Sequence, residues 1–236
     1  EVITVSEVLE VYSPQMLRWI FAKQKPNSDF SISFDEDVIK AHDEFDRFEK
    51  QALGQPAGGK WDAIRRTYEL ALVDETNIPT APPFRPAFRE LCTRLQLAGA
   101  DPEKTLQRYY QDDVKTEADR ASFHERSLRA LNWLEKYAPE EFQYRLHATP
   151  VDVPMDDSQK QAVAALKEVL DQADLEAIAP KELNEKIYAA AIHGTGLENP
   201  KDFFRVVYQK LIGRDQGPRL PMFLKEIGKS RVLELL

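Results

Sequence analysis

Apolar side chains recur at helical spacing along most of this chain, and this period constrains the fold more than any other feature. Later stretches at residues 162–170, 183–191 and 204–211 repeat the spacing of three and four residues that places side chains on one helix face. Only residues 2–5 and 31–34 favour short extended pieces. We therefore predict an all-α fold with a short strand element. The longest one-sided stretch contains Phe123, Ala130, Leu131, Leu134, Tyr137 and Ala138.

Helix ends are marked by residues that satisfy free backbone groups. Thr116 and Asp119 resemble a capping box, and Gly213 is placed to end the helix that begins near residue 200. A further helix is expected from Asp35 to about Leu53. A capping residue followed by proline, which favours the first helical turn, occurs at Ser13-Pro14, Asp101-Pro102 and Asn199-Pro200.

Segments rich in proline and glycine interrupt the helical pattern and indicate boundaries. They are "GQPAGGK" at residues 54–60, "ETNIPTAPPFRP" at residues 75–86 and "HATPVDVPMDD" at residues 147–157. The last is the strongest candidate linker. We predict three regions, spanning residues 1–57, 58–150 and 151–236.

Composition narrows the class of protein. Of the 236 residues, 42% are hydrophobic and 31% charged, as in ordinary globular domains, and no apolar run is long enough to cross a membrane. The single Cys92 fits a helix core and a reducing cytoplasm. The net charge of −8 argues against a generic nucleic-acid binder, which would usually have a basic surface. Residues 181–236 nevertheless hold 10 Lys and Arg against 7 Asp and Glu, which predicts a local anion-facing patch.

Catalytic and metal-binding motifs are weak. Residues 54–60 match the G-x-x-x-x-G-K spacing of a phosphate-binding loop, but Trp61 replaces the Ser or Thr and a helix precedes the loop. Acidic residues between Asp35 and Asp46 spread around a helix, and the four His residues lack zinc-site spacing. We therefore name no catalytic and no metal-binding residue.

Two stretches resemble class I lysyl-tRNA synthetases. One is "VITVSEVLEVYSPQMLRWIFAKQKPNSDFSISFDEDVIKAHDEFDRFE" at residues 2–49, and the other is "FFRVVYQKLIGRDQGPRLPMFLKEIG" at residues 203–228. Residues 78–79, 84–85 and 88–89 also match that family. The resemblance implies a stem-contact region at residues 1–57, a first helical bundle, and a helical anticodon-binding cage at residues 151–236.

The same resemblance implies what this chain lacks. The family's HIGH-like and KMSKS-like motifs, which bind ATP, are absent from the sequence. Glu1 is therefore expected to lie just after the KMSKS-like loop, with a Rossmann catalytic domain preceding it in cis. This part alone is expected to be inactive and to need no cofactor, whereas the whole cytoplasmic enzyme would use ATP with magnesium to attach lysine to its tRNA.

Lysine-accepting tRNA is the expected partner, with no DNA and no membrane. Basic side chains neutralise phosphates, and unpaired anticodon bases stack on aromatic or guanidinium planes. Arg214 and Arg219 are the strongest candidates, at a turn bracketed by Gly213 and Gly217, with Pro218 expected to open the next helix. The complete candidate set is Arg205, Tyr208, Lys210, Arg214, Gln216 and Arg219 near the C-terminus, with Arg18, Lys23 and Lys25 near the start.

Other interpretations stay open at this stage. The "GRDQGPRL" segment would also suit a tight turn in which Arg214 pairs with Asp215. Trp19 and Phe21, beside the first basic cluster, fit core positions better than base-stacking positions. Glutamyl-tRNA synthetases share a related C-terminal region, so the corresponding part of such an enzyme is an alternative. A helical protein-interaction module without RNA function is the other, favoured by the acidic balance.

Overall fold

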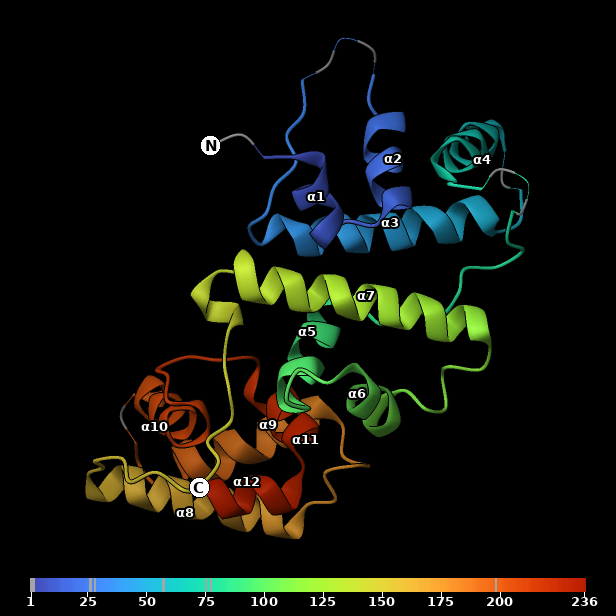
Figure 1. Cartoon of the computed structure of the whole chain (residues 1–236). Coiled ribbons are helices and arrows are strands. Elements are labelled where there is room, and N and C mark those ends of the chain that lie inside the picture. The colour runs from blue at the N-terminus through green and yellow to red at the C-terminus, as the bar shows by residue number, and fades with distance from the viewer. Residues whose placement is uncertain are drawn as a thin grey trace. The chain divides into compact units, whose positions relative to one another are not determined.

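The computed structural model describes residues 3–25, 27, 29–56, 58–74, 76, 78–197 and 199–236, and most of these residues are helical. These residues form twelve α-helices and no strand, which confirms the all-α prediction (Figure 1). The chain divides into unit 1 (Glu1–Gln143) and unit 2 (Tyr144–Leu236). The three regions predicted from sequence stay a prediction.

Unit 1 is built around α7, which packs against α1 and α5, while α4 packs on α2 and α3. Its core contains the predicted apolar face along α7, of which Phe123, Ala130, Leu134 and Ala138 are buried while Leu131 and Tyr137 are partly buried. Cys92 of α5 is also buried, as expected. The helices of this unit are α1 (Val5–Val11), α2 (Pro14–Ala22), α3 (Asp37–Leu53), α4 (Gly59–Ala71), α5 (Phe88–Leu97), α6 (Pro102–Tyr109), α7 (Glu117–Lys136) and the short 3-10 helix η1 (Glu140–Phe142).

The strand predicted at residues 2–5 is wrong, because Val5 opens α1. The Thr4 hydroxyl accepts a hydrogen bond from the Glu7 N–H, and the Glu7 carboxylate accepts one from the Thr4 N–H at 2.7 Å. This capping box satisfies donors that the helix start would otherwise leave free. It outweighs the strand preference of the β-branched side chains. Val2 lies outside the described residues.

Residues 31–34 also form no strand, although the sequence favoured one. Their carbonyl groups find side-chain donors instead of a neighbouring strand. The Tyr12 hydroxyl donates to the Ser33 carbonyl at 2.6 Å, and the Trp133 indole N–H donates to the Phe34 carbonyl at 2.9 Å. Because a strand needs a backbone partner, this segment remains a connection between α2 and α3.

The helix starts predicted at a capping residue followed by proline, and at Thr116, are confirmed. Ser13 accepts a hydrogen bond from the Met16 N–H at 3.1 Å, with Pro14 as the first residue of α2. Asp101 and Asn199 cap α6 and α10 in the same way. Thr116 and Asp119 form the expected capping box, and a second Asp119 oxygen accepts from the Phe84 N–H at 2.7 Å. The caps therefore fix both the helix ends and a neighbouring connection.

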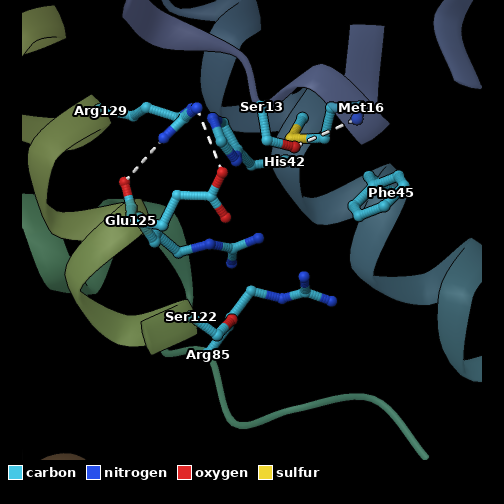
Figure 2. Close-up of a pocket in the computed structure, with 9 residues that line it drawn as sticks. Ser13, Met16, His42, Phe45, Arg85, Ser122, Glu125 and Arg129 are labelled. Carbon is cyan, nitrogen blue, oxygen red and sulfur yellow. Dashed lines mark hydrogen bonds and ion pairs between the residues drawn. The ribbon is translucent and has the colours of Figure 1, made fainter. Parts of the chain in front are cut away.

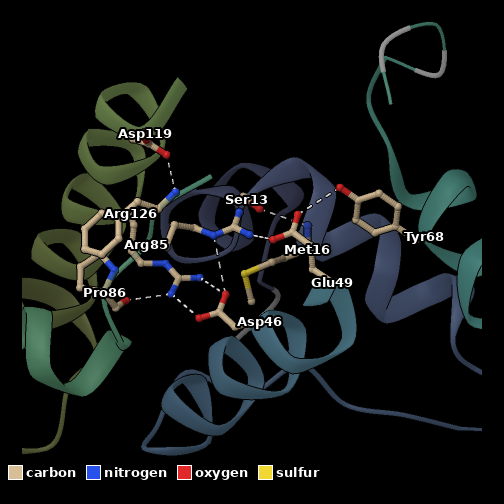
Figure 3. Close-up of polar contacts among 10 residues, drawn as sticks. Ser13, Met16, Asp46, Glu49, Tyr68, Arg85, Pro86, Asp119 and Arg126 are labelled. Atoms are coloured by element: carbon tan, nitrogen blue, oxygen red, sulfur yellow. Dashed lines mark hydrogen bonds and ion pairs between the residues drawn. The ribbon is translucent and has the colours of Figure 1, made fainter. Parts of the chain in front are cut away.

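A buried ion pair joins α7 to α3 (Figure 3). The Arg126 guanidinium donates to both carboxylate oxygens of Asp46 at 2.6 Å, and it also donates to the Pro86 carbonyl at 3.0 Å. Only 4% of the Arg126 side chain is exposed. The three contacts satisfy a charge that would otherwise be costly to bury.

A second buried group extends this network toward α4. Arg85, from the segment before α5, pairs with Glu49 of α3, and the Tyr68 hydroxyl of α4 donates to Glu49 at 3.1 Å (Figure 3). Burial lowers the pKa of Arg85 to about 10. The guanidinium therefore stays charged at neutral pH, and the network holds the proline-rich connection against two helices.

Unit 2 packs around α8, which contacts η2, α10 and α12, while α11 lies against α9 and α12. Asp156 caps α8 with Gln159, so the predicted linker ends where the helix begins. The core of unit 2 contains Leu166, Phe203 and Leu224, all fully buried. The helices are α8 (Asp157–Gln172), α9 (Pro180–Ile187), the π-helix η2 (Tyr188–His193), α10 (Pro200–Ile212), α11 (Leu220–Ile227) and α12 (Lys229–Leu235).

Candidate nucleic-acid interface

The turn between α10 and α11 presents the strongest candidates. Gly213 ends α10 as predicted, in the left-handed conformation (φ 69°, ψ 24°), with its N–H bonded to the Gln209 carbonyl at 3.0 Å. Helix α11 begins at Leu220 with Arg219 at its N-cap. The expectation that Pro218 opens this helix is therefore wrong, because the helical turn starts two residues later.

Side chains of this turn differ in how far they reach solvent. Gln216 and Arg219 are exposed, whereas Arg214 is half-buried. The Arg219 guanidinium forms no ion pair with any residue that the structure describes. The Asp215 carboxylate accepts a hydrogen bond from the Gln209 amide at 2.8 Å, which ties the turn to α10. The turn thus exposes both a guanidinium without an ion pair among the described residues and an amide, three residues apart in the sequence.

Tyr208 supports the turn from inside. Its ring is buried, and its hydroxyl donates to the Pro218 carbonyl. Burial raises the pKa of Tyr208 to about 12, so the hydroxyl remains a donor at neutral pH. The ring lies against Gly217, where a Cβ atom would come within 2.7 Å of it. Its faces are covered by the protein, and the residue positions the turn.

Lys210 is a buried lysine without a hydrogen bond or ion pair among the described residues. Only 7% of the residue is exposed. Its pKa is lowered by desolvation and then by the charge of Lys167 on α8, which Asp152 partly offsets. The like charge of Lys167 and the partial desolvation of the Lys210 ammonium both favour the arrival of an anion.

Arg205 lies on the exposed side of α10, where its guanidinium pairs with Asp202 at 3.2 Å. Both side chains are well exposed, at 48% and 38%, so the pair is weak. Arg205 therefore remains accessible to a ligand with a stronger negative charge.

Basic candidates near the start lie in unit 1. Arg18 on α2 donates to the Leu70 carbonyl at 3.1 Å and thereby covers the end of α4. Lys23 pairs with Glu44 at 3.2 Å and lies 3.9 Å from the centre of the Trp19 ring. Lys25 is exposed. The three side chains follow one another along α2 and the turn after it.

The aromatic residues beside this cluster take different positions. Trp19 is buried in the core, as expected, whereas 57% of Phe21 is exposed. Phe21, Val5 and Leu70 border an apolar hollow on unit 1, with Arg18 at its edge. The expectation of a core position is therefore right for Trp19 and wrong for Phe21, because α2 turns that side outward.

A small, partly open cavity in unit 1 lies among charged side chains (Figure 2). Its volume of about 10 Å³ fits a single water molecule. Two residues that line it, His42 and Ser122, each have a buried polar atom without a hydrogen-bond partner among the described residues. These atoms are His42 Nδ1 and Ser122 Oγ. Arg129 pairs with Glu125 at 3.2 Å beside them. The cavity is too small for a substrate, and its charged residues serve the structure.

Nucleotide and metal motifs have no matching geometry in the described part of the chain. Residues 54–60 connect the end of α3 to the start of α4, whereas a phosphate-binding loop follows a strand. No three His, Cys, Asp or Glu side chains among the described residues group to hold a metal ion. The described helices include none that is long and apolar enough to span a membrane.

Similarity to known proteins covers the whole chain. The family model of class I (K) tRNA synthetases matches residues 1–74. Lysine–tRNA ligase of Treponema pallidum is 34% identical over 240 residues, which cover 100% of this chain and 44% of the ligase. The ligase of Thermococcus kodakarensis is 31% identical over 245 residues, covering 100% and 45%. The ligase of Borreliella burgdorferi is 32% identical over 235 residues, covering 98% and 43%.

These matches confirm the resemblance to class I lysyl-tRNA synthetases that residues 2–49 and 203–228 indicated. The relatives include both a spirochaete and an archaeal enzyme, and each aligns with nearly every residue of the chain. The chain spans under half the length of the curated relatives that it matches.

Proposed function

We propose, from the premise that this chain is related along its whole length to class I lysyl-tRNA synthetases, that it binds the stem and anticodon of lysine-accepting tRNA. The observation that carries the proposal is the similarity to lysine–tRNA ligases over 100% of the chain. Lysine in the names of these relatives favours the lysine enzyme over a glutamyl-type enzyme.

Unit 2 would read the anticodon. Arg219 and Gln216 project from a turn whose backbone is fixed by Gly213 and by the Tyr208 hydroxyl. A fixed turn has little backbone freedom left to lose on binding, which favours specific recognition of unpaired bases. Arg214 and Arg205 would add contacts to phosphates, with Arg205 exchanging Asp202 for the RNA.

Lys210 would receive a backbone phosphate. Its ammonium lies in a poorly solvated position close to Lys167, and an anion would relieve both penalties. Asp152 offsets part of the positive charge from the protein side. A phosphate contact of this kind strengthens binding without reading sequence.

Unit 1 would contact the tRNA stem through Arg18, Lys23 and Lys25. The Lys23 side chain is 33% exposed and is already held by Glu44 and by the Trp19 ring. These contacts order the Lys23 side chain at the surface, where its ammonium can bind a phosphate. Contacts of this kind position the duplex and carry no sequence information.

The whole cytoplasmic enzyme would attach lysine to the tRNA using ATP with magnesium, which would bind in a Rossmann catalytic domain. The one stretch with phosphate-loop spacing, residues 54–60, lies between α3 and α4 and follows a helix, which supports placing the ATP site in that other domain. This part would therefore be inactive alone. Its contribution would be to position the tRNA, which lowers the entropic cost of presenting the acceptor end to the active site.

Binding of tRNA to the 236-residue chain tests the proposal. We expect affinity for a lysine-tRNA transcript that falls steeply between about 50 and 200 mM salt, because phosphate contacts release counterions. A transcript with an altered anticodon should bind more weakly. Arg219→Glu should weaken binding of the first transcript and reduce the difference between the two.

Lys104→Glu is a matched control, because this lysine is 73% exposed on α6 of unit 1 and belongs to none of the candidate clusters. It should change affinity far less than Arg219→Glu. Equal binding of both transcripts would contradict anticodon reading, and absence of tRNA binding would contradict the proposal as a whole.

The apolar hollow on unit 1 favours the alternative of a protein-interaction module. Phe21 and Val5 are 57% and 67% exposed there, and contiguous exposed apolar groups often mark protein contacts. Under this alternative, Arg219→Glu leaves the affinity for tRNA unchanged. Phe21→Ser would then alter the interaction of the chain with a protein partner.

A further inference from the structure

Three aromatic rings gather at the surface of unit 2, apart from the turn between α10 and α11. The Tyr188 ring centre lies 6.2 Å from that of His193 and 5.9 Å from that of Phe204. Tyr188 and Phe204 are half-buried, and His193 is exposed. Phe203, which is fully buried, meets the Phe204 ring edge to face at 5.3 Å and anchors the cluster in the core.

A π-helical turn brings two of these rings together. Residues five apart in an α-helix point about 140° away from each other, so Tyr188 and His193 would diverge. In η2 the Gly194 N–H reaches back five residues to the Ala189 carbonyl at 2.9 Å. This bonding pattern stacks residues five apart, and single π turns are frequent at functional sites.

Glycine at position 194 makes this turn possible. A Cβ atom there would lie 2.7 Å from the Ala190 carbonyl oxygen, which is too close for any other residue without a shift of the backbone. Gly194 is therefore needed for the position of the His193 ring beside Tyr188, and neither residue belongs to the candidate interface described above.

Cations flank the cluster on α10. Lys201 lies three residues before Phe204 and shares its side of the helix, whereas Arg205 lies four residues after Lys201 and is its neighbour on the helix surface. Lys201 is exposed and forms no ion pair with the residues that the structure describes. Arg205 holds only its weak surface pair with Asp202. Aromatic faces next to cations suit a ligand that has both flat rings and phosphates.

We propose that Tyr188, His193 and Phe204 form a stacking platform for unpaired bases of an RNA loop, with Lys201 and Arg205 on the adjoining phosphates. Proteins that hold single-stranded RNA combine aromatic stacking surfaces with a positively charged backbone track. The platform deepens the proposed function, on which it rests, and it adds residues that are distinct from the Arg219 turn.

Affinity for an RNA hairpin that carries the lysine anticodon loop tests the platform. Tyr188→Ala and Phe204→Ala should each weaken binding by about 5- to 100-fold, the effect of losing one stacked base. Tyr188→Phe keeps the ring and should bind like the parent chain, whereas Tyr188→Leu keeps only apolar bulk and should not. The same hairpin with abasic sites in its loop should bind the parent and Tyr188→Ala equally.

Met222→Ala is the matched control, because this apolar side chain of unit 2 is 47% exposed on α11. It should leave the affinity unchanged. Far-UV circular dichroism should give every variant the helix content of the parent chain. Photo-cross-linking of the unsubstituted chain to a loop with 4-thiouridine avoids any loss of folding, and the cross-links should map to peptides containing residues 188–205.

Two results would overturn the platform in different ways. If the chain binds the hairpin but Tyr188→Ala and Phe204→Ala bind equally well, or if the cross-links map elsewhere, the platform is refuted and the tRNA-binding function stands. If the chain binds neither the hairpin nor tRNA, the proposed function and the platform fail together.

Discussion

Gly217 lies so close to the ring of Tyr208 that an added Cβ atom would come within 2.7 Å of two ring carbons. Tyr208 is buried and cannot move aside cheaply, so Gly217→Ala should displace the ring or the turn. We expect a loss of about 1–3 kcal/mol in the free energy of unfolding, as for overpacked cores. Thermal unfolding followed by circular dichroism would measure it.

Gly59→Ala provides the control for this substitution. Gly59 begins α4, and a Cβ atom there would meet nothing within 4 Å. It should leave stability unchanged or slightly raised, since alanine favours helices. Tryptophan fluorescence should be unaffected by Gly217→Ala, because Trp19, Trp61 and Trp133 all lie in unit 1. A Gly217→Ala chain as stable as the parent would contradict the contact.

His42 should make unit 1 less stable in acid. The ring is stacked between Tyr12 and Phe88, and its Nε2–H donates to the Val11 carbonyl at 3.3 Å. Burial lowers the pKa of His42 well below its usual value, and the charge of Arg126 adds to this effect. His42 therefore binds a proton near pH 6.5 in the unfolded chain but stays neutral at that pH in the folded chain. The free energy of unfolding consequently falls as the pH drops below this value.

His42→Phe tests this prediction, because phenylalanine can fill the same stack without titrating. Urea unfolding followed by tryptophan fluorescence at pH 7.5 and 5.5 should show a loss in the parent of up to about 1.4 kcal/mol per pH unit. The loss should be smaller in His42→Phe, whereas His193→Gln, at an exposed position of unit 2, should keep it. Equal pH slopes in the parent and His42→Phe would refute the role of this residue.

The ion pair of Arg126 and Asp46 should be essential to unit 1. Arg126→Ala removes the two hydrogen bonds that the guanidinium donates to the partly buried Asp46 carboxylate. It also removes the hydrogen bond that the guanidinium donates to the Pro86 carbonyl. We expect a loss of about 3 kcal/mol or more in the free energy of unfolding. Lys186→Ala removes the exposed pair with Glu182, at 3.0 Å, and should cost less than about 1 kcal/mol. Similar losses in the two variants would contradict the argument.

Local signals in the sequence predicted helix ends well, because a cap acts within four residues. Ser13 with Pro14, and Thr116 with Asp119, form the expected hydrogen bonds. The same reasoning failed at Val5, where the capping pair of Thr4 and Glu7 was present but the β-branched run was given more weight. Strand preference expresses packing against neighbours, and no neighbouring strand exists among the described residues.

Contacts between distant residues could not be predicted from local spacing. Tyr208 was predicted from the sequence to contact RNA bases. In the fold its ring packs against Gly217, and its hydroxyl donates a hydrogen bond to the Pro218 carbonyl. Tyr188 and His193 do not share an α-helical face, so their cluster depends on a π turn that the apolar pattern does not indicate. The available signal in the sequence was Gly194, which directly follows His193, with Tyr188 five residues before that histidine.

Lys210 should contribute to RNA binding more than to stability. Lys210→Met keeps the buried aliphatic stem and removes an ammonium that desolvation and Lys167 already disfavour. Stability should therefore be unchanged or slightly higher, while the slope of log affinity against log salt should fall by about one for the lost phosphate contact. Lys181→Met is the matched control, because Lys181 is exposed on α9 and does not belong to the candidate set. It should alter neither the stability nor the salt slope. An unchanged salt slope for Lys210→Met would show that the buried ammonium does not meet a phosphate.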